Sequence, residues 1–133
     1  MKIGLIGAGR LGICLALLIE KAGYEVLASD SRVDYIENLQ KGIIDTAEPE
    51  VQQYLSDAKN IEFTTDNTRV IAECDLIFTL VATPSLKDGS YDVSAVWKVI
   101  DDFKEIPILL DEKSLVIGCT TNPGDCNDFQ EAL

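Results

Sequence analysis

The first thirty residues consist of two short apolar runs with an amphipathic stretch between them. Residues 2–6 are a short apolar run, which predicts a β-strand. A longer amphipathic stretch follows and predicts a helix that ends near Lys21 and Gly23. Its expected inward face carries Leu11, Cys14, Leu15, Leu18, Ile19 and Ala22, which recur every three or four positions. Residues 25–29 predict a second strand ending on Asp30, so this part of the chain predicts a βαβ unit.

The same alternation continues to the end of the chain. Further strands are predicted at 61–65, 76–81 and 114–119. Helices are predicted at 33–40, with Ile36 and Leu39 inward, and from Glu48-Pro49-Glu50, with Val51, Tyr54 and Leu55 inward. Another is predicted at 68–73 after an Asp66 N-cap, with Val70, Ile71 and Cys74 inward. The last two begin at Asp92, with Val93, Val96, Trp97, Ile100 and Phe103 on one side, and at Asp125. Pro107 interrupts the pattern. Trp97 and Phe103 are expected in the core or in an interface.

Strands alternating with helices predict an α/β protein with a doubly wound parallel sheet, a Rossmann-type domain spanning residues 1–133. Ligands bind such sheets outside the carboxyl ends of the strands. In this chain, Gly7, Asp30, Thr83 and Thr120 follow four of the predicted strands. We therefore expect these residues at one edge of the sheet.

The first of these ends carries a complete G-x-G-x-x-G motif, Gly7 to Gly12, between a strand and a helix. In a dinucleotide site the first glycine permits the tight turn, the second lets the backbone approach the pyrophosphate, and the third allows close helix–strand packing. The helix N-terminus then faces the phosphates. Asp30, 18 residues beyond Gly12, is expected to bind the adenosine ribose. The alternative is a glycine turn in an ordinary βαβ unit without a ligand.

Asp30 also predicts the choice of cofactor. A carboxylate repels a 2′-phosphate, so NAD is favoured over NADP, although Arg32 is close in sequence. Replacing Asp30 by alanine should weaken NAD binding by about 1–3 kcal/mol, because hydrogen-bonding groups are left without partners.

Charge and composition exclude several other classes. The net charge of −12 disfavours nucleic acid and anionic membranes, and makes backbone dipoles rather than lysines the expected phosphate ligands. Histidine is absent, and Cys14, Cys74, Cys119 and Cys126 show no metal-ligand spacing, so no metal site is predicted. No apolar run is long enough to span a bilayer and no signal peptide is expected, which predicts a reduced cytoplasmic protein.

Several motifs together resemble the NAD-binding domain of the UDP-glucose/GDP-mannose dehydrogenase family. They are Lys2 to Gly12, Asp30, Glu48-Pro49, Val81-Ala82-Thr83-Pro84, Asp88-Gly89-Ser90-Tyr91-Asp92 and Cys119-Thr120-Thr121-Asn122-Pro123-Gly124. The resemblance implies oxidation of the C6 hydroxyl of a nucleotide sugar such as UDP-glucose to a carboxylate, in two NAD-dependent steps through a cysteine adduct. It implies cofactor contacts by Gly7, Gly9, Arg10, Leu11, Gly12, Asp30, Arg32, Tyr35, Thr83, Pro84 and Thr120, with Thr120 also supporting catalysis.

Three positions depart from the family pattern. Tyr35 stands where a basic residue is usual, and Arg32 is a nearby substitute. Glu50 replaces a glycine after Glu-Pro. The usual Ser-Thr-Val-Pro is Cys119-Thr120-Thr121-Asn122, so Cys119 matches a serine and is not the family's nucleophile.

The family's cysteine nucleophile, its lysine partner and its nucleotide-sugar site lie beyond the stretch that this chain matches. The 133 residues are therefore expected to bind NAD without turnover. The resemblance also implies a homo-oligomer. Two alternatives stay open: a cofactor domain of the 3-hydroxyacyl-CoA or 6-phosphogluconate type of dehydrogenase, and a non-catalytic NAD-sensing module.

Overall fold

Short apolar runs form one parallel sheet in the computed structural model, which describes residues 1–106 and 112–133. The predicted interruption at Pro107 lies outside these residues. Within them the sheet has the strands β1 (Lys2–Ile6), β2 (Glu25–Ser29), β3 (Ile61–Thr64), β4 (Leu76–Thr79) and β5 (Ser114–Ile117). Three of these strands end one or two residues before the predicted limits, because the partner strands end there: Thr79 pairs with Ile6, the last residue of β1.

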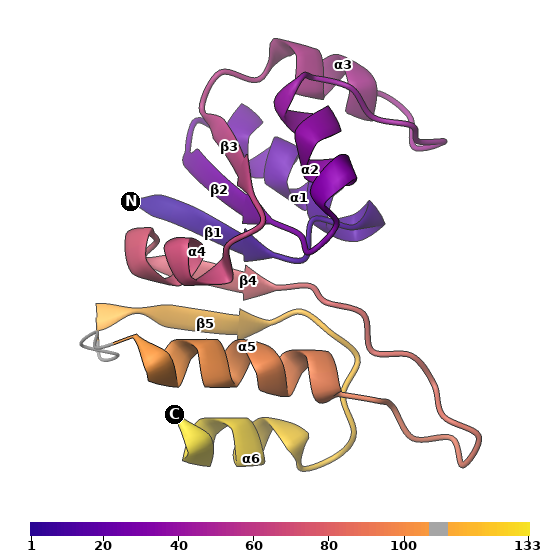
Figure 1. The fold of residues 1–133 in the computed structure, drawn as a ribbon, viewed down its shortest axis with the longest axis vertical. Coiled ribbons are helices and arrows are strands. Elements are labelled where there is room, and N and C mark those ends of the chain that lie inside the picture. Colours follow the sequence, from indigo (N-terminus) through magenta and orange to yellow (C-terminus); the bar gives the residue numbers. More distant parts are fainter. Residues whose placement is uncertain (107–111) are drawn as a thin grey trace.

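The strand order is β3-β2-β1-β4-β5, with every neighbouring pair parallel. Strand β1 lies in the centre, where Ile3 pairs with Val26 on one side and Leu76 on the other. Strand order reverses between β1 and β4, which is the switch point at which doubly wound sheets bind ligands. The predicted doubly wound α/β fold is therefore confirmed (Figure 1).

Helices cover both faces of the sheet (Figure 1). They are α1 (Arg10–Lys21), α2 (Val33–Gln40), α3 (Val51–Asp57), α4 (Asn67–Glu73), α5 (Ser94–Glu105) and α6 (Asp125–Ala132). Helices α1, α2 and α3 share one hydrophobic cluster with Ile3, Leu5 and Val26, whereas α4 and α5 share another with Ile6 and Leu27. The alternation of side chains along β1 and β2 thus supplies both cores.

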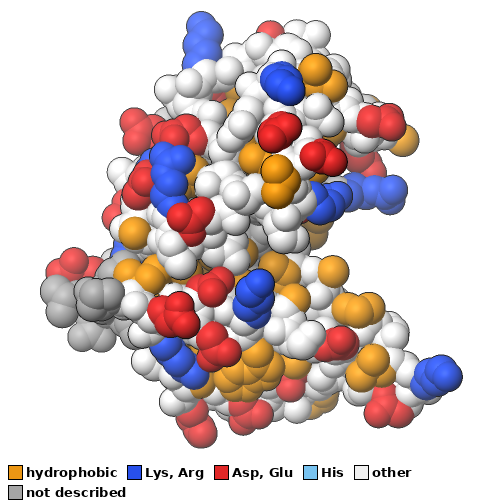
Figure 2. Space-filling view, viewed as in Figure 1, with side chains coloured by type: hydrophobic (Ala, Val, Ile, Leu, Met, Phe, Trp, Pro, Cys, Tyr) orange, Lys and Arg blue, Asp and Glu red, His pale blue; other side chains and the backbone are white. Residues whose placement is uncertain are grey.

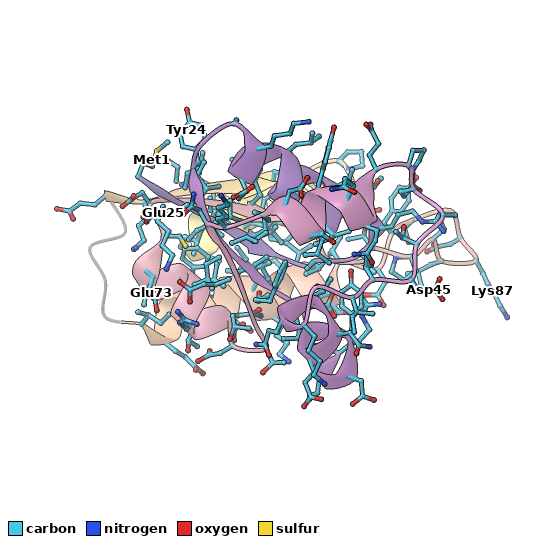
Figure 3. The ribbon with its side chains drawn as sticks, turned by 90° about the horizontal axis from the view of Figure 1, so that it is seen from above. Met1, Tyr24, Glu25, Asp45, Glu73 and Lys87 are labelled. Atoms are coloured by element: carbon cyan, nitrogen blue, oxygen red, sulfur yellow. The ribbon has the colours of Figure 1, made fainter. Side chains whose placement is uncertain are left out.

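The two ends of the strands lie on opposite sides of the molecule. Met1, Tyr24, Glu25 and Glu73 lie at the amino ends of the strands, and Lys87 lies far out at the other end (Figure 3). The carboxyl edge, with Gly7, is therefore a separate surface from the one that carries the N-terminus.

The predicted inward face of α1 is only partly correct, because Cys14, Leu15 and Ile19 pack partly buried against the core but Leu11, Leu18 and Ala22 are exposed. Ile13, Ala16 and Leu17 are buried, whereas Leu11 is 65% and Leu18 53% exposed. The helix is apolar on more than one side, so periodicity alone could not decide its rotation. Contact between Gly12 and the glycine turn decides it, because that contact directs the neighbouring side chain of Ile13 into the core.

The predicted start of the helix after Glu48 is also wrong. Residues 48–50 form a turn, and α3 begins at Val51. Glu50 is its N-cap and has a left-handed backbone, with φ of 63°. Glycine is the residue that adopts this conformation most readily, which explains why a glycine is usual here. Val51 and Leu55 are buried as predicted.

The other helices agree with the sequence pattern. The Asp66 carboxylate accepts hydrogen bonds from the backbone N–H groups of Thr68 and Arg69 at 2.9 and 3.3 Å, which confirms it as an N-cap. The Trp97 ring packs edge-on against Phe129 of α6 at 4.8 Å between centroids. Trp97 therefore contributes to the core between α5 and α6.

Candidate cofactor site

The glycine turn is held in place by backbone contacts from two neighbouring strands. The N–H groups of Gly7 and Ala8 both donate to the carbonyl of Ser29, at 2.9 Å. Gly7 has φ of 100°, and a Cβ there would lie 2.7 Å from the carbonyl of Leu80. Only glycine satisfies both conditions, so the turn after β1 depends on the residue at this position.

The other two glycines of the motif have different surroundings. A Cβ on Gly12 would lie 2.0 Å from the carbonyl oxygen of Gly7, so helix and turn touch directly there. A Cβ on Gly9 would meet nothing within 4 Å. Gly12 is therefore needed for packing, whereas the chain itself gives no reason for glycine at position 9. The open space over Gly9 is where a ligand can approach the backbone.

A cavity of about 570 Å³ opens over this turn at the carboxyl edge of the sheet. It is lined by Ile6, Gly7, Gly9, Arg10, Leu11, Gly12, Asp30, Ser31, Arg32, Thr65, Asn67, Leu80, Val81, Ala82, Ala95, Lys98 and Val99. The surface is hollowed on this side, with basic side chains extending from the upper rim (Figure 2). The cavity brings together the predicted residues Gly7, Gly9, Arg10, Leu11, Gly12, Asp30 and Arg32.

The lining has the opposite charge balance from the whole chain. Arg10, Arg32 and Lys98 supply three positive charges, and Asp30 supplies the negative charge. The chain as a whole carries −12. Positive side chains converging on a concave surface attract anions locally whatever the net charge. The expectation that backbone dipoles rather than lysines bind the phosphates stays a prediction, and the cavity wall adds basic side chains beside that backbone.

Asp30 is already paired within the chain. Its Oδ1 accepts from Nε of Arg32 at 2.8 Å and from the Arg32 backbone N–H at 3.1 Å, and its Oδ2 accepts from the terminal guanidinium nitrogen at 2.9 Å. Burial alone would raise the pKa of Asp30, but these hydrogen bonds and the charge of Arg32 outweigh it, so the pKa lies below its usual value. Asp30 is therefore a carboxylate at neutral pH.

Tyr35 lies behind this pair and outside the cavity. Its hydroxyl donates to the carbonyl of Ala8 at 2.8 Å, and the guanidinium carbon of Arg32 lies 4.1 Å from its ring centroid. Tyr35, which belongs to α2, thus links the glycine turn to Arg32. The sequence offered Arg32 as a substitute for the basic residue that is usual at position 35, and the structure places Arg32 against the Tyr35 ring.

Thr83, Pro84 and Thr120 are not among the residues that line this cavity. Thr83 and Pro84 belong to the start of an arm, residues 82–92, that projects from the carboxyl edge (Figure 1). Thr120 is exposed in the loop after β5. The structure brings the glycine turn and Asp30 together but leaves these three residues outside that group.

Asn122 joins the arm to the loop after β5. Its amide nitrogen donates to the carbonyl of Tyr91 at 3.0 Å, and its amide oxygen accepts from the Tyr91 N–H at 2.8 Å. The Asp125 carboxylate accepts from the Asn122 backbone N–H at 2.7 Å. The departure from the family pattern at position 122 therefore has a structural role.

The partly or fully buried thiols lack the environment of a nucleophile. Burial raises the pKa of Cys14 and Cys119, and raises that of Cys74 to about 11. The Cys119 thiol donates to the Thr79 carbonyl at 3.3 Å. A nucleophilic cysteine needs a lowered pKa or an adjacent base. These three cysteines have neither.

Sequence reasoning missed Lys98 and Asn67. Ala95, Lys98 and Val99 are spaced i, i+3, i+4 on α5 and line the cavity together. That spacing is visible in the sequence, but the same helix carries a stronger apolar stripe on another side. Asn67 accepts from the Ser29 hydroxyl at 2.7 Å and donates to Asp102 at 3.0 Å, so it fixes α4 and α5 below the cavity.

Across residues 1–106 and 112–133, no helix combines the length and apolarity that a bilayer-spanning segment needs.

Two relatives with names that indicate an activity match the whole of this chain. The protein YtcA of Bacillus subtilis (strain 168), provisionally named a UDP-glucose 6-dehydrogenase, is 32% identical over 100% of this chain and 31% of its own length. A UDP-glucose 6-dehydrogenase of Rhizobium meliloti (strain 1021) is 30% identical over 100% of this chain and 31% of its own. This chain thus spans about a third of the length of these relatives.

A solved structure shows the same fold. A GDP-mannose dehydrogenase from Pseudomonas aeruginosa, in a ternary complex, superposes with a TM-score of 0.87 at 24% identity, over 99% of this chain and 32% of that one. The model of the UDP-glucose/GDP-mannose dehydrogenase family, NAD binding domain, matches residues 1–133. Neither alternative, a cofactor domain of the 3-hydroxyacyl-CoA or 6-phosphogluconate type or a non-catalytic NAD-sensing module, has better support than this family. The chain belongs to the UDP-glucose/GDP-mannose dehydrogenase family, as its NAD-binding domain.

Proposed function

We propose that residues 1–133 are the cofactor domain of an enzyme that oxidises the C6 hydroxyl of UDP-glucose or a related nucleotide sugar to a carboxylate. In this proposal the cavity binds the ADP half of NAD. The pyrophosphate lies over Gly9 and the adenosine ribose lies at Asp30.

The open space at Gly9 carries the proposal. Gly7 and Gly12 are explained by contacts within the chain, but nothing in the chain lies within 4 Å of a Cβ on Gly9. The first turn of α1 begins there, and the first N–H groups of a helix have no intrahelical acceptor. A diphosphate over Gly9 would accept from these groups and lie at the positive end of the helix dipole.

Charge on the cavity wall supports the same ligand. Arg10 and Lys98 line the space over the turn, and their charges would offset part of those of a diphosphate, whereas Arg32 is paired with Asp30. Asp30 at the far side offers a carboxylate oxygen to a ribose hydroxyl. The residues therefore fit the two polar parts of the ADP group.

Bound NAD would accept a hydride in each of the two oxidation steps. Thr83, Pro84 and Thr120 follow β4 and β5 at the same edge of the sheet, and we assign them to the nicotinamide side of the cofactor. Thr120 keeps a supporting role in catalysis in this proposal.

The rest of the enzyme enters the proposal from its relatives. We propose that the nucleotide-sugar site and the nucleophile lie in the part of such enzymes that this chain does not match, and that the protein acts as a homo-oligomer in the cytoplasm. All four cysteines are free thiols, as is usual in a reducing compartment.

Calorimetric titration of the 133-residue chain with NAD tests the proposal. The wild type should bind, and Gly9→Ala should lower the affinity at least tenfold, because the methyl group fills the space meant for the pyrophosphate. Its free energy of unfolding should change by less than about 1 kcal/mol, since the Cβ meets no neighbour.

Gly12→Ala is the matched control. Its Cβ would lie 2.0 Å from the Gly7 carbonyl oxygen, so stability should fall by about 1–3 kcal/mol or more. Absence of binding heat with the wild type at millimolar NAD would refute the proposed function.

A further inference from the structure

Arg32 uses most of the acceptor capacity of Asp30. An ionised carboxylate offers about four lone-pair positions, two on each oxygen. Arg32 fills two on Oδ1, through Nε and its backbone N–H, and one on Oδ2. One position on Oδ2 is left. Asp30 can therefore accept one ribose hydroxyl while Arg32 stays in place, not both hydroxyls of the diol.

Arg32 is held by a second contact that does not involve Asp30. Its guanidinium lies 4.1 Å from the Tyr35 ring centroid, within the range of a cation–π contact. The Tyr35 hydroxyl is bonded to Ala8, so the ring is fixed relative to the glycine turn. Removing the Asp30 carboxylate would thus leave Arg32 at the cavity wall with its full charge and all its side-chain donors free.

We infer that the Asp30–Arg32 pair, rather than Asp30 alone, determines which adenine dinucleotide the cavity accepts, with Tyr35 as the positioning residue for Arg32. The inference rests on the proposed function, because it concerns the ribose end of the same site. While Arg32 is bonded to Asp30, the carboxylate faces the ribose and excludes a 2′-phosphate. When Arg32 is released from Asp30, it becomes a ligand for that phosphate, since its planar guanidinium binds phosphate oxygens bidentately.

Two fragments isolate this end of the cofactor from the nicotinamide end. The probes are ADP and adenosine 2′,5′-bisphosphate, titrated into the 133-residue chain by calorimetry. The wild type should bind ADP more tightly. Asp30→Asn, which keeps the shape of the side chain, and Asp30→Ala should both reverse the order, with about a 10- to 100-fold gain for the bisphosphate from a charge-assisted phosphate contact.

The double variant Asp30→Ala/Arg32→Ala should lose that gain. Arg32→Ala alone should keep ADP binding within about threefold, because Asp30 then recovers acceptor positions for the ribose. Adding Tyr35→Ala to Asp30→Asn should remove most of the gain, whereas Tyr35→Phe should keep the larger part of it, because the ring under Arg32 remains and only the bond to Ala8 is lost.

Glu62→Ala is the matched control. Glu62 is an exposed partner of Arg69, and both lie away from the cofactor cavity, so removing its carboxylate should alter neither titration. The inference is overturned if Asp30→Asn gains no affinity for the bisphosphate, or if the double variant keeps the gain. A wild type that binds neither NAD nor ADP would instead refute the proposed function. Circular dichroism of each variant separates lost binding from lost folding.

Discussion

At the scale of single residues, charge in the cavity is set by a few side chains from separate elements. Arg10 comes from the start of α1, Arg32 from the residue before α2, and Lys98 from α5. None of the three is close to the other two in sequence. Only the crossing of the chain at the switch point gathers them around the glycine turn.

Lys98 should contribute to NAD binding through a charged contact at the cavity wall. Lys98→Ala should weaken NAD binding by about 0.5–1.5 kcal/mol, or roughly two- to tenfold, at low salt. The loss should shrink at 1 M salt, where the screening length is about 3 Å. Lys87→Ala at the tip of the arm is the control, and an equal loss in both variants would show a general charge effect instead.

At the scale of elements, the start of α3 is strained at one residue. Glu50 is the only non-glycine residue with positive φ in the part of the chain that the structure describes. The left-handed conformation costs an L-residue roughly 1–2 kcal/mol. Replacement by glycine removes that cost but adds about 0.4–1 kcal/mol of chain entropy.

Glu50→Gly should therefore stabilise the chain by about 0.5–1 kcal/mol, a rise of roughly 2–4 °C in Tm. Glu50→Ala should give no such gain, because alanine keeps the Cβ that makes the conformation costly. Thermal unfolding of both variants decides the matter. A lower Tm for Glu50→Gly would show that the glutamate side chain stabilises the turn.

An exposed ion-pair cluster links β1, β3 and α4 at the amino ends of the strands. The Glu73 carboxylate accepts from Arg69 at 2.7 Å and from Lys2 at 2.6 Å, and these hydrogen bonds lower its pKa from 4.5 to about 2. A carboxylate with a lowered pKa stabilises the folded state above its unfolded pKa, and this contribution is lost as pH falls through the folded pKa.

Glu73→Gln should accordingly be less stable than the wild type above about pH 4.5, and the difference should vanish as pH falls toward 2. Urea unfolding of both proteins between pH 7 and 2 measures it. A difference that is independent of pH would mean that packing, not charge, connects these elements.

At the scale of the whole molecule, the chain is expected to bind NAD without consuming it. It has no histidine, and burial raises the pKa of Cys14, Cys74 and Cys119, so these thiols lack activation. Incubation of the 133-residue chain with NAD and UDP-glucose should give no increase in absorbance from NADH. Turnover that survives repurification would contradict this prediction.

Local pattern was sufficient for much of the fold and for part of the site. Apolar runs of four to six residues predicted the strands, Asp66 predicted a helix start, and the glycine motif with Asp30 predicted residues that line one cavity at the carboxyl edge of the sheet. The strands and the helix start depend on residues within one element, and the glycine motif with Asp30 spans a single βαβ unit. The family resemblance added the NAD assignment, which the family match bears out.

The amino-acid sequence by itself determined which segments along the chain form strands and helices, and where the glycine turn lies, because periodicity and turn chemistry act over a few residues. Only the tertiary structure decided which side of α1 is buried, that Lys98 lines the cavity, and that Arg32 binds Asp30 above Tyr35. The rotation of a helix about its axis is set by contacts such as that of Gly12 with Gly7. The partners of a side chain are set by which distant segments pack together. Neither is encoded in the spacing of residues along the chain.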